Sequence, residues 1–169
     1  FIRLEPPIDP AELTRSREQA SIPSFGFFFL LAASVIIATL GLLSNSTGVI
    51  IGAMIVAPLM NPILSVAYGI VSANWQLYRR SLMTLVFGVI VSILLSYGLS
   101  HVAAVSIAGS EILARTEPNL FDLGIAIAAG AAGAFSLTRA SIASSIAGVA
   151  IAVALVPPLC VVSIGLEMG

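Results

Sequence analysis

The sequence has 169 residues, of which 59% are apolar and 9% are charged, and its formal net charge is −1. Soluble domains contain about 45–50% apolar and about 25% charged residues, so this composition excludes a water-soluble globule and indicates a membrane protein. The sequence has no basic cluster of the kind that binds nucleic acid, no glycine-rich phosphate loop and no metal-ligand spacing. We therefore expect no nucleic-acid partner, no metal and no cofactor.

A polar segment, residues 1–23, precedes the apolar part of the chain. Asp9 is a predicted N-cap, with Pro10 at the first helical position and Glu12 three residues after the cap. These residues predict a short helix over residues 10–20, lying on the cytoplasmic surface. Because the sequence begins without a methionine or a signal sequence, we expect a soluble part to precede it in the natural protein.

Residues 24–169 form the predicted transmembrane domain, in which long stretches carry no charged residue. A membrane span needs about 20 apolar residues, so these stretches can be divided into five helices. The first covers about residues 25–43 and ends at the polar turn SNSTG. The second covers about residues 49–73 and contains Pro58 and Pro62 in an otherwise apolar run.

The remaining three spans follow the same division. The third begins at residue 81 and ends between residues 99 and 108, where the apolar sequence fixes no edge. The fourth covers about residues 121–137 and is rich in Gly and Ala, which favours close helix packing and makes a homo-oligomer plausible. The fifth covers about residues 141–166 and contains Pro157 and Pro158.

The arginines predict how the chain crosses the membrane, because the sequence has no lysine. With the N-terminus in the cytoplasm, six arginines lie on the cytoplasmic side and Arg115 alone lies outside, which satisfies the positive-inside rule. Trp75 and Tyr78 then fit the aromatic belt at the cytoplasmic surface. The six arginines are Arg3, Arg15, Arg17, Arg79, Arg80 and Arg139.

Two segments of the sequence also resemble each other. A shift of 96 residues aligns about residues 25–70 with about residues 121–166 and gives ten identities, among them Pro62 with Pro158. Chance matching of Ala, Gly and Ile is the alternative explanation. Since three spans separate the two copies, they would enter the membrane from opposite faces, as the inverted repeats of many secondary transporters do. A sixth helix is then expected, in a 3+3 plan.

The prolines predict interruptions inside the second and fifth spans. Proline has no amide hydrogen, so backbone carbonyls four residues earlier lose their helical partners. Lipid cannot satisfy these carbonyls, which must face protein, water or a ligand. The segments are either kinked or unwound, and unwound segments would point helix N-termini toward a polar spot. The predicted substrate-binding residues there are Met54, Pro58, Asn61, Pro62, Ser65, Val153, Ala154, Pro157 and Pro158.

Asn61 is the first of these candidates, because its amide both donates and accepts hydrogen bonds. The alternative is that Asn61 repairs the backbone that the prolines interrupt. Ser65 and Met54 are weaker candidates, since serine in a span commonly bonds its own helix and methionine commonly fills gaps. Elsewhere, His101 is expected at the surface near the outer end of the third span, and Cys160 is interpreted as a small apolar residue.

Three motifs in order carry a resemblance to a known family. They are IGAMIVAPLMNPI, RTEPNLFDLGIAIAAGAAGAFSL and GVAIAVALVPPL. Together they resemble the prokaryotic "uncharacterised hydrophobic domain" proteins, also called domain of unknown function 389, from about residue 24 to the end of the chain. The resemblance implies a multi-span protein of a prokaryotic inner membrane, often with a further apolar span after the VPPL motif.

The leading functional hypothesis is a transporter or channel for a small solute or ion. An anion such as bicarbonate is suggested by inward helix N-termini and by the absence of buried bases. An enzyme is not expected, because one His, one Cys and no carboxylate deep in a span leave little for acid–base or nucleophilic chemistry. The alternative is a structural or sensory oligomeric membrane module without transport activity.

Overall fold

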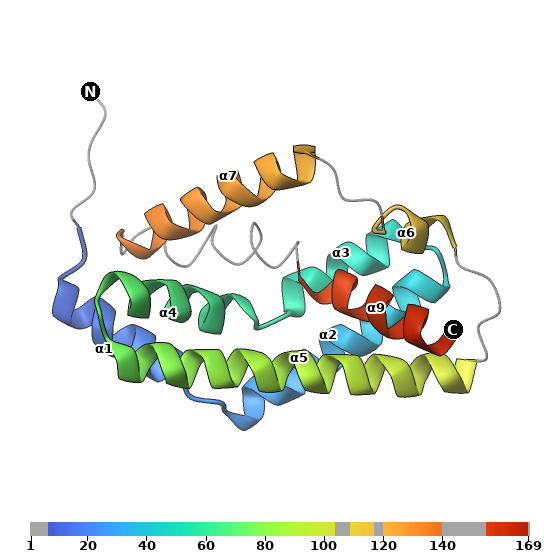
Figure 1. Cartoon of the computed structure of the whole chain (residues 1–169), viewed down its shortest axis with the longest axis horizontal. Coiled ribbons are helices and arrows are strands. Elements are labelled where there is room, and N and C mark those ends of the chain that lie inside the picture. The colour runs from blue at the N-terminus through green and yellow to red at the C-terminus, as the bar shows by residue number, and fades with distance from the viewer. Residues whose placement is uncertain (1–6, 104–108, 117–119, 140–154, 169) are drawn as a thin grey trace.

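The described part of the chain is built of helices. The computed structural model describes residues 7–103, 109–116, 120–139 and 155–168. Within these ranges, extended backbone pairs at one isolated bridge between Pro7 and Arg139, so the predicted all-α class is confirmed. The helices are α1 (Pro10–Ala20), α2 (Phe25–Leu43), α3 (Thr47–Val56), α4 (Met60–Val71), α5 (Trp75–Ala103), α6 (Ser110–Leu113), α7 (Leu120–Leu137) and α9 (Val156–Met168) (Figure 1).

The polar N-terminal helix forms where it was predicted. The Asp9 carboxylate accepts a hydrogen bond from the Ala11 amide at 3.1 Å, and Pro10 occupies the first helical position. α1 packs against α4. The Thr14 hydroxyl lies 2.9 Å from the Tyr68 hydroxyl, which fastens one helix to the other.

The first predicted span is α2, with the predicted bounds. Its N-cap, Ser24, accepts a hydrogen bond from the Phe27 amide at 3.1 Å. A tight turn follows, in which Asn45 adopts a left-handed backbone conformation with a φ of 52°. The Asn45 side chain also accepts a hydrogen bond from the Glu111 amide at 2.9 Å, so the turn holds α6 at this end of the molecule. α3 then packs back along α2.

The second predicted span is interrupted, as expected. α3 ends at Val56, α4 begins at Met60, and their axes meet at 54°. α4 then runs antiparallel to the first half of α5. Leu59 contacts the position of Gly88 and Gly69 lies against Tyr78, which fixes the register of this pair.

The third span begins earlier than predicted. α5 starts at Trp75 rather than at residue 81, because the Asn74 side chain caps it: its Oδ1 accepts a hydrogen bond from the Leu77 amide at 3.0 Å. Arg79 and Arg80 therefore lie inside the helix. With 29 residues, α5 is about 43 Å long, which exceeds the hydrocarbon thickness of about 30 Å.

Three of the described helices, α2, α5 and α7, are long and apolar enough to cross a membrane, or four spans if α3 and α4 count as one broken span. α7 agrees with the predicted fourth span to within one residue. α9 is apolar but has only 13 residues, and the predicted fifth span lies outside the described residues before Leu155. The structure thus describes helices at the first four predicted spans and only the end of the fifth.

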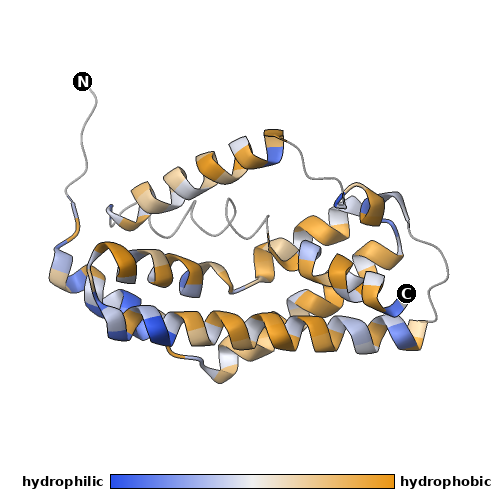
Figure 2. Ribbon diagram, viewed as in Figure 1, coloured by the Kyte–Doolittle hydropathy of each residue, from blue (hydrophilic) through white to orange (hydrophobic). Residues whose placement is uncertain are grey.

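The interior joins α2, α3, α5 and α9. Leu31, Val35 and Leu42 of α2 are fully buried with Ile50 of α3 and Ile164 of α9. α5 is mostly hydrophobic between its two ends (Figure 2). The residues that it buries are mainly small or hydroxyl-bearing, whereas large apolar residues such as Met83, Val86 and Phe87 are exposed. The buried residues of α5 are Leu77, Ser81, Thr84, Gly88, Ser92, Ser96 and Ser100.

The contact of α4 with α5 gives a testable prediction about stability. A Cβ atom at residue 69 would lie 2.9 Å from the Tyr78 nitrogen and 3.0 Å from its Cα atom, which are backbone atoms that cannot move aside. We expect Gly69→Ala to lower the free energy of unfolding by about 1–3 kcal/mol through overpacking. The measurement is thermal unfolding in detergent, followed by a thiol-reactive dye, because Cys160 is fully buried and is the single cysteine.

Gly98→Ala is the matched control, because no atom of another described helix lies within 4 Å of a Cβ placed at residue 98 of the same α5 helix. Alanine is the better helix former, so this variant should unfold at the same temperature as the parent or slightly above it. Equal losses in the two variants would contradict the close approach of α4 and α5.

Candidate functional site

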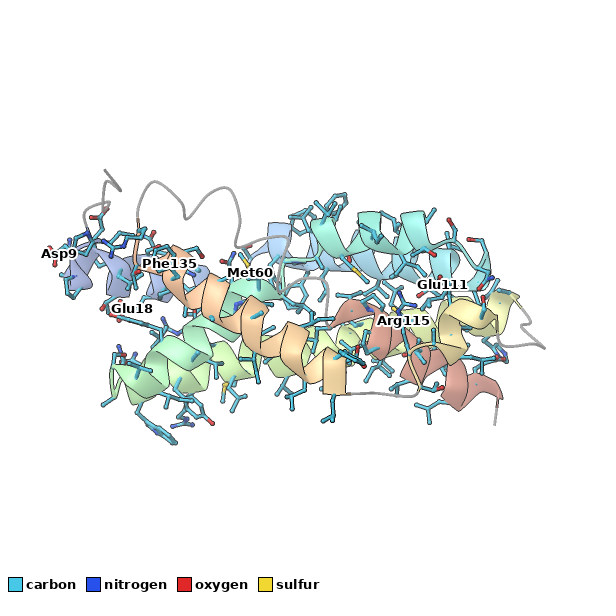
Figure 3. All side chains as sticks on the ribbon, turned by 90° about the horizontal axis from the view of Figure 1, so that it is seen from above. Asp9, Glu18, Met60, Glu111, Arg115 and Phe135 are labelled. Carbon is cyan, nitrogen blue, oxygen red and sulfur yellow. The ribbon has the colours of Figure 1, made fainter. Side chains whose placement is uncertain are left out.

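The interruption between α3 and α4 is the candidate site. Residues 57–59 are not helical, and Figure 3 places Met60 between the two polar ends of the molecule, with Asp9 and Glu18 at one end and Glu111 and Arg115 at the other. Leu59 packs against Gly88 of α5. Gly88 lies eight residues beyond Arg80, the last arginine of α5, which corresponds to about 12 Å along the helix axis. The interruption therefore lies inside the apolar part of the bundle.

Hydrogen bonds on either side of the interruption show where the helical ladder stops. The Ala57 amide still donates to the Ala53 carbonyl at 3.2 Å, and the Ile63 amide donates to the Leu59 carbonyl at 3.3 Å. Pro58 has no amide hydrogen to offer the Met54 carbonyl, as predicted. In addition, the Ser34 hydroxyl of α2 donates to the Ala53 carbonyl at 2.8 Å, in a fully buried contact. A side chain from a neighbouring helix thus supports the last turn of α3.

α9 meets α3 near this point. The two helices are in contact, and Met54, Ala57 and Leu59 belong to one buried cluster with Val156. Figures 1 and 3 both show the beginning of α9 beside the junction of α3 with α4. The structure therefore brings the interrupted span together with the start of the proline-containing helix, although they lie about a hundred residues apart in the sequence.

Most of the prolines in the two predicted broken spans lie in the first turns of helices. Pro62 occupies the third residue of α4, and Pro157 and Pro158 occupy the second and third residues of α9. Amide groups in the first turn of a helix have no helical acceptor, so proline is tolerated there. Pro58 thus lies within the break and Pro62 lies just after it, in the first turn of α4, while the predicted interruption of the fifth span before Pro157 falls outside the described residues. Val153 and Ala154 lie outside the described residues.

The polar candidates do not converge on the break. Asn61 is exposed in the first turn of α4, so its side chain does not face the interior with Met54, which is buried. Ser65 is buried, but its hydroxyl donates to the Arg17 carbonyl of α1 at 3.3 Å, so it joins α4 to the surface helix. Among the prolines, Pro62 and Pro157 are buried, Pro58 is half-buried and Pro158 is exposed.

A buried polar group deeper in the bundle was missed by the sequence interpretation. The Thr39 hydroxyl of α2 donates to the Ser96 hydroxyl of α5 at 2.9 Å, and both residues are fully buried. Cys160 of α9, which is fully buried, lies near both hydroxyls. The spacing of Ser92, Ser96 and Ser100 on α5 was the available signal, because residues four apart lie on one face of a helix. Cys160 belongs to the buried hydrophobic cluster, in keeping with its interpretation as a small apolar residue, and has these two hydroxyls as neighbours.

The ionisable residues lie near the ends of the bundle. His101 is 74% exposed and its Nδ1 lies 3.4 Å from Glu167, which places it at the surface as predicted. Glu111 lies beside Arg115 at 2.7 Å and accepts a hydrogen bond from Thr47. The Thr47 hydroxyl and the Arg115 guanidinium lower the pKa of the Glu111 carboxyl. Within the described residues, no three His, Cys, Asp or Glu side chains are grouped as a metal site.

The similarity of the chain to known proteins agrees with the resemblance of its motifs. The family profile described as Domain of unknown function (DUF389) matches residues 54–169. An uncharacterized protein of Methanocaldococcus jannaschii is 35% identical over 140 residues, which cover 83% of this chain and 43% of that protein. The chain thus spans less than half the length of this relative. No solved structure matches the chain.

The support that Ser34 gives to α3 leads to a testable prediction. Ser34→Ala removes a buried donor to the Ala53 carbonyl, so we expect it to lower the free energy of unfolding by about 1 kcal/mol. Ser72→Ala is the matched control, because the Ser72 hydroxyl is exposed and donates at 2.7 Å within its own turn, to the Tyr68 carbonyl. Circular dichroism during titration with sodium dodecyl sulfate measures both variants. A loss in Ser72→Ala as large as that in Ser34→Ala would contradict the assigned contact.

Proposed function

Because the chain belongs to the family described as Domain of unknown function (DUF389), we propose its activity from its geometry: it is a membrane transporter or channel for a small solute or ion. The observation that carries this proposal is the break between α3 and α4, which lies inside an apolar bundle and adjoins the start of α9. A continuous helix satisfies its own backbone, whereas an interrupted helix in a membrane is tolerated where protein, water or a ligand meets its polar groups. Interrupted helices that meet inside the membrane form the solute sites of many secondary transporters.

We also propose that the chain contains an inverted repeat, in which α4 of the first copy is equivalent to α9 of the second. α4 begins at Met60 and α9 begins at Val156, which are 96 residues apart, the same shift that aligns the sequence with itself. Each helix has proline at its third position, Pro62 in α4 and Pro158 in α9. α2 and α7, which contain 19 and 18 residues, occupy the other pair of equivalent positions. The agreement of helix starts supports a 3+3 plan with a further helix.

The chemistry of the break favours some solutes over others. Pro58 and Pro62 replace the amides that would serve the Met54 and Pro58 carbonyls, so acceptors are in excess. The missing amide hydrogen of proline also weakens anion binding at the helix starts, because Pro157 and Pro158 remove two amide donors from the first turn of α9. We therefore place a cation such as sodium, or a neutral solute with hydrogen-bond donors, ahead of an anion such as bicarbonate.

The distribution of arginines supports an N-terminus in the cytoplasm. α1 carries Arg15 and Arg17, and α1 packs on α4, which is antiparallel to the part of α5 that carries Arg79 and Arg80. The backbone of Arg139 pairs with Pro7, just before α1. Arg115 instead lies with Glu111 beside the turn that joins α2 to α3. One end of the bundle thus carries most of the described arginines, as the cytoplasmic side of a membrane protein does.

The second candidate is a structural or sensory membrane module, and a specific observation favours it. The side chains around the break are mostly apolar and closely packed, with Leu59 only 2% exposed and Val156 1% exposed. α7 leaves apolar residues such as Phe121, Ile125 and Ile127 exposed, as an oligomer interface would before assembly. In this alternative the helices anchor an assembly, and no solute passes through them.

A flux assay tests the transport proposal. The purified protein is reconstituted into liposomes, and uptake of radioactive sodium, chloride and bicarbonate is compared with uptake into protein-free liposomes. We expect sodium flux above the protein-free level, and we expect Pro58→Ala to reduce it by about tenfold, equivalent to ~1.4 kcal/mol, because a restored amide satisfies the Met54 carbonyl. Gly98→Ala, which alters an open position on α5, should retain the parental flux.

The results separate the two candidate functions. Flux of chloride or bicarbonate that exceeds flux of sodium would overturn the assignment of solute class but keep the transport proposal. Flux that survives Pro58→Ala unchanged would remove the break from the pathway. If no ion passes faster than in protein-free liposomes while the protein sediments as a stable oligomer in detergent, the anchoring module replaces the transporter.

A further inference from the structure

A groove on the outer face of the bundle has no part in the proposed pathway. It has a volume of about 640 Å³ and lies where the start of α2 meets the first half of α5. The surface of the groove is almost entirely apolar, and Arg79 and Arg80 border it at the end near the start of α5. The lining residues are Pro23, Phe28, Trp75, Gln76, Arg79, Arg80, Met83, Thr84 and Phe87.

The arginines and the apolar side chains are separated along the axis of α5. Arg79 and Arg80 lie near its start, and Phe87 follows Arg80 by seven residues, or about 10 Å. Trp75 stacks on Tyr78 with ring centroids 5.0 Å apart, beside the arginines. Aromatic residues of this type occupy the membrane–water interface. The groove therefore begins at the level of lipid headgroups and continues to the level of acyl chains.

The arginines are available to a ligand. Both are exposed, and within the described part of the chain neither forms an ion pair with a carboxylate. A guanidinium group binds phosphate oxygens in a bidentate manner. The apolar wall is available too, because Met83 is 54% exposed and Phe87 is 60% exposed. Two unpaired cations next to an open apolar wall match the charge and the shape of an anionic lipid.

We propose that this groove binds an anionic phospholipid, with the phosphate on Arg79 and Arg80 and an acyl chain along Phe28, Met83 and Phe87. A basic pocket on the cytoplasmic side of a membrane protein attracts anionic headgroups. The apolar wall adds the burial of acyl methylene groups to this electrostatic attraction. The site lies on the outer face of α5, so lipid binding does not depend on transport through the break.

Binding of phosphatidylglycerol and phosphatidylcholine to the detergent-purified protein tests the proposal. The number and affinity of bound lipids are measured by native mass spectrometry. We expect tighter binding of phosphatidylglycerol, and we expect Arg79→Gln or Arg80→Gln to weaken it by about fivefold each, since a basic residue near an anionic surface contributes about that factor. The double variant should lose about 25-fold, while its weak binding of phosphatidylcholine stays unchanged.

Arg15→Gln is the matched control, because Arg15 is an exposed arginine of α1 that does not line the groove. It should keep the parental affinity for phosphatidylglycerol. Phe87→Ala tests the apolar wall and should weaken both lipids, whereas glycerol phosphate without acyl chains should compete poorly. Equal loss in Arg15→Gln and in Arg79→Gln, or unchanged phosphatidylglycerol binding in the double variant, would overturn the proposal. Strong competition by glycerol phosphate would identify a phosphate site without the lipid chain.

Discussion

The constraint on which the structure depends is that backbone polar groups inside an apolar bundle must be satisfied. Within α2 and α5 the helical ladder does this without help. Between α3 and α4 the ladder stops for three residues, and just before this break the Ser34 hydroxyl adds a second donor to the Ala53 carbonyl, which already accepts from the Ala57 amide. The interior of this protein is therefore organised around a local defect in hydrogen bonding, with α2, α5 and α9 arranged about it.

The small residues on the buried face of α5 allow other helices to pack closely at the break between α3 and α4. Gly88 admits the Leu59 side chain, which would lie 3.1 Å from a Cβ atom at that position. The serines beyond Gly88 satisfy their hydroxyls along the helix itself, since Ser92 donates to the Gly88 carbonyl and Ser100 to the Ser96 carbonyl. This arrangement buries hydroxyl groups without leaving their hydrogens unpaired. Ser96 is left to meet Thr39 of α2, and that contact ties two helices together.

Much of the helix plan could be predicted from the sequence, because spans and caps are local features. The bounds of α1 and α2 follow from Asp9 and from a run of apolar residues with polar ends. The start of α5 could not be found from hydropathy, since Asn74 starts the helix within a polar segment. The outward orientation of Asn61 could not be predicted from the sequence either. Which side of a short helix faces the core depends on the 54° bend before it, and hydropathy does not encode this angle.

Adjacent residues of α5 belong to the two proposed sites, the lipid groove and the break between α3 and α4. Phe87 faces outward and lines the groove, whereas Gly88 faces inward and receives Leu59. Adjacent residues of a helix point about 100° apart, so one rod carries both surfaces with little overlap in side chains. A lipid in the groove would press on the outer face of α5 at the depth of the break. Any coupling between lipid and solute would then pass through the position of α5 or through Phe28, which lines the groove and packs against the buried cluster that contains Leu59.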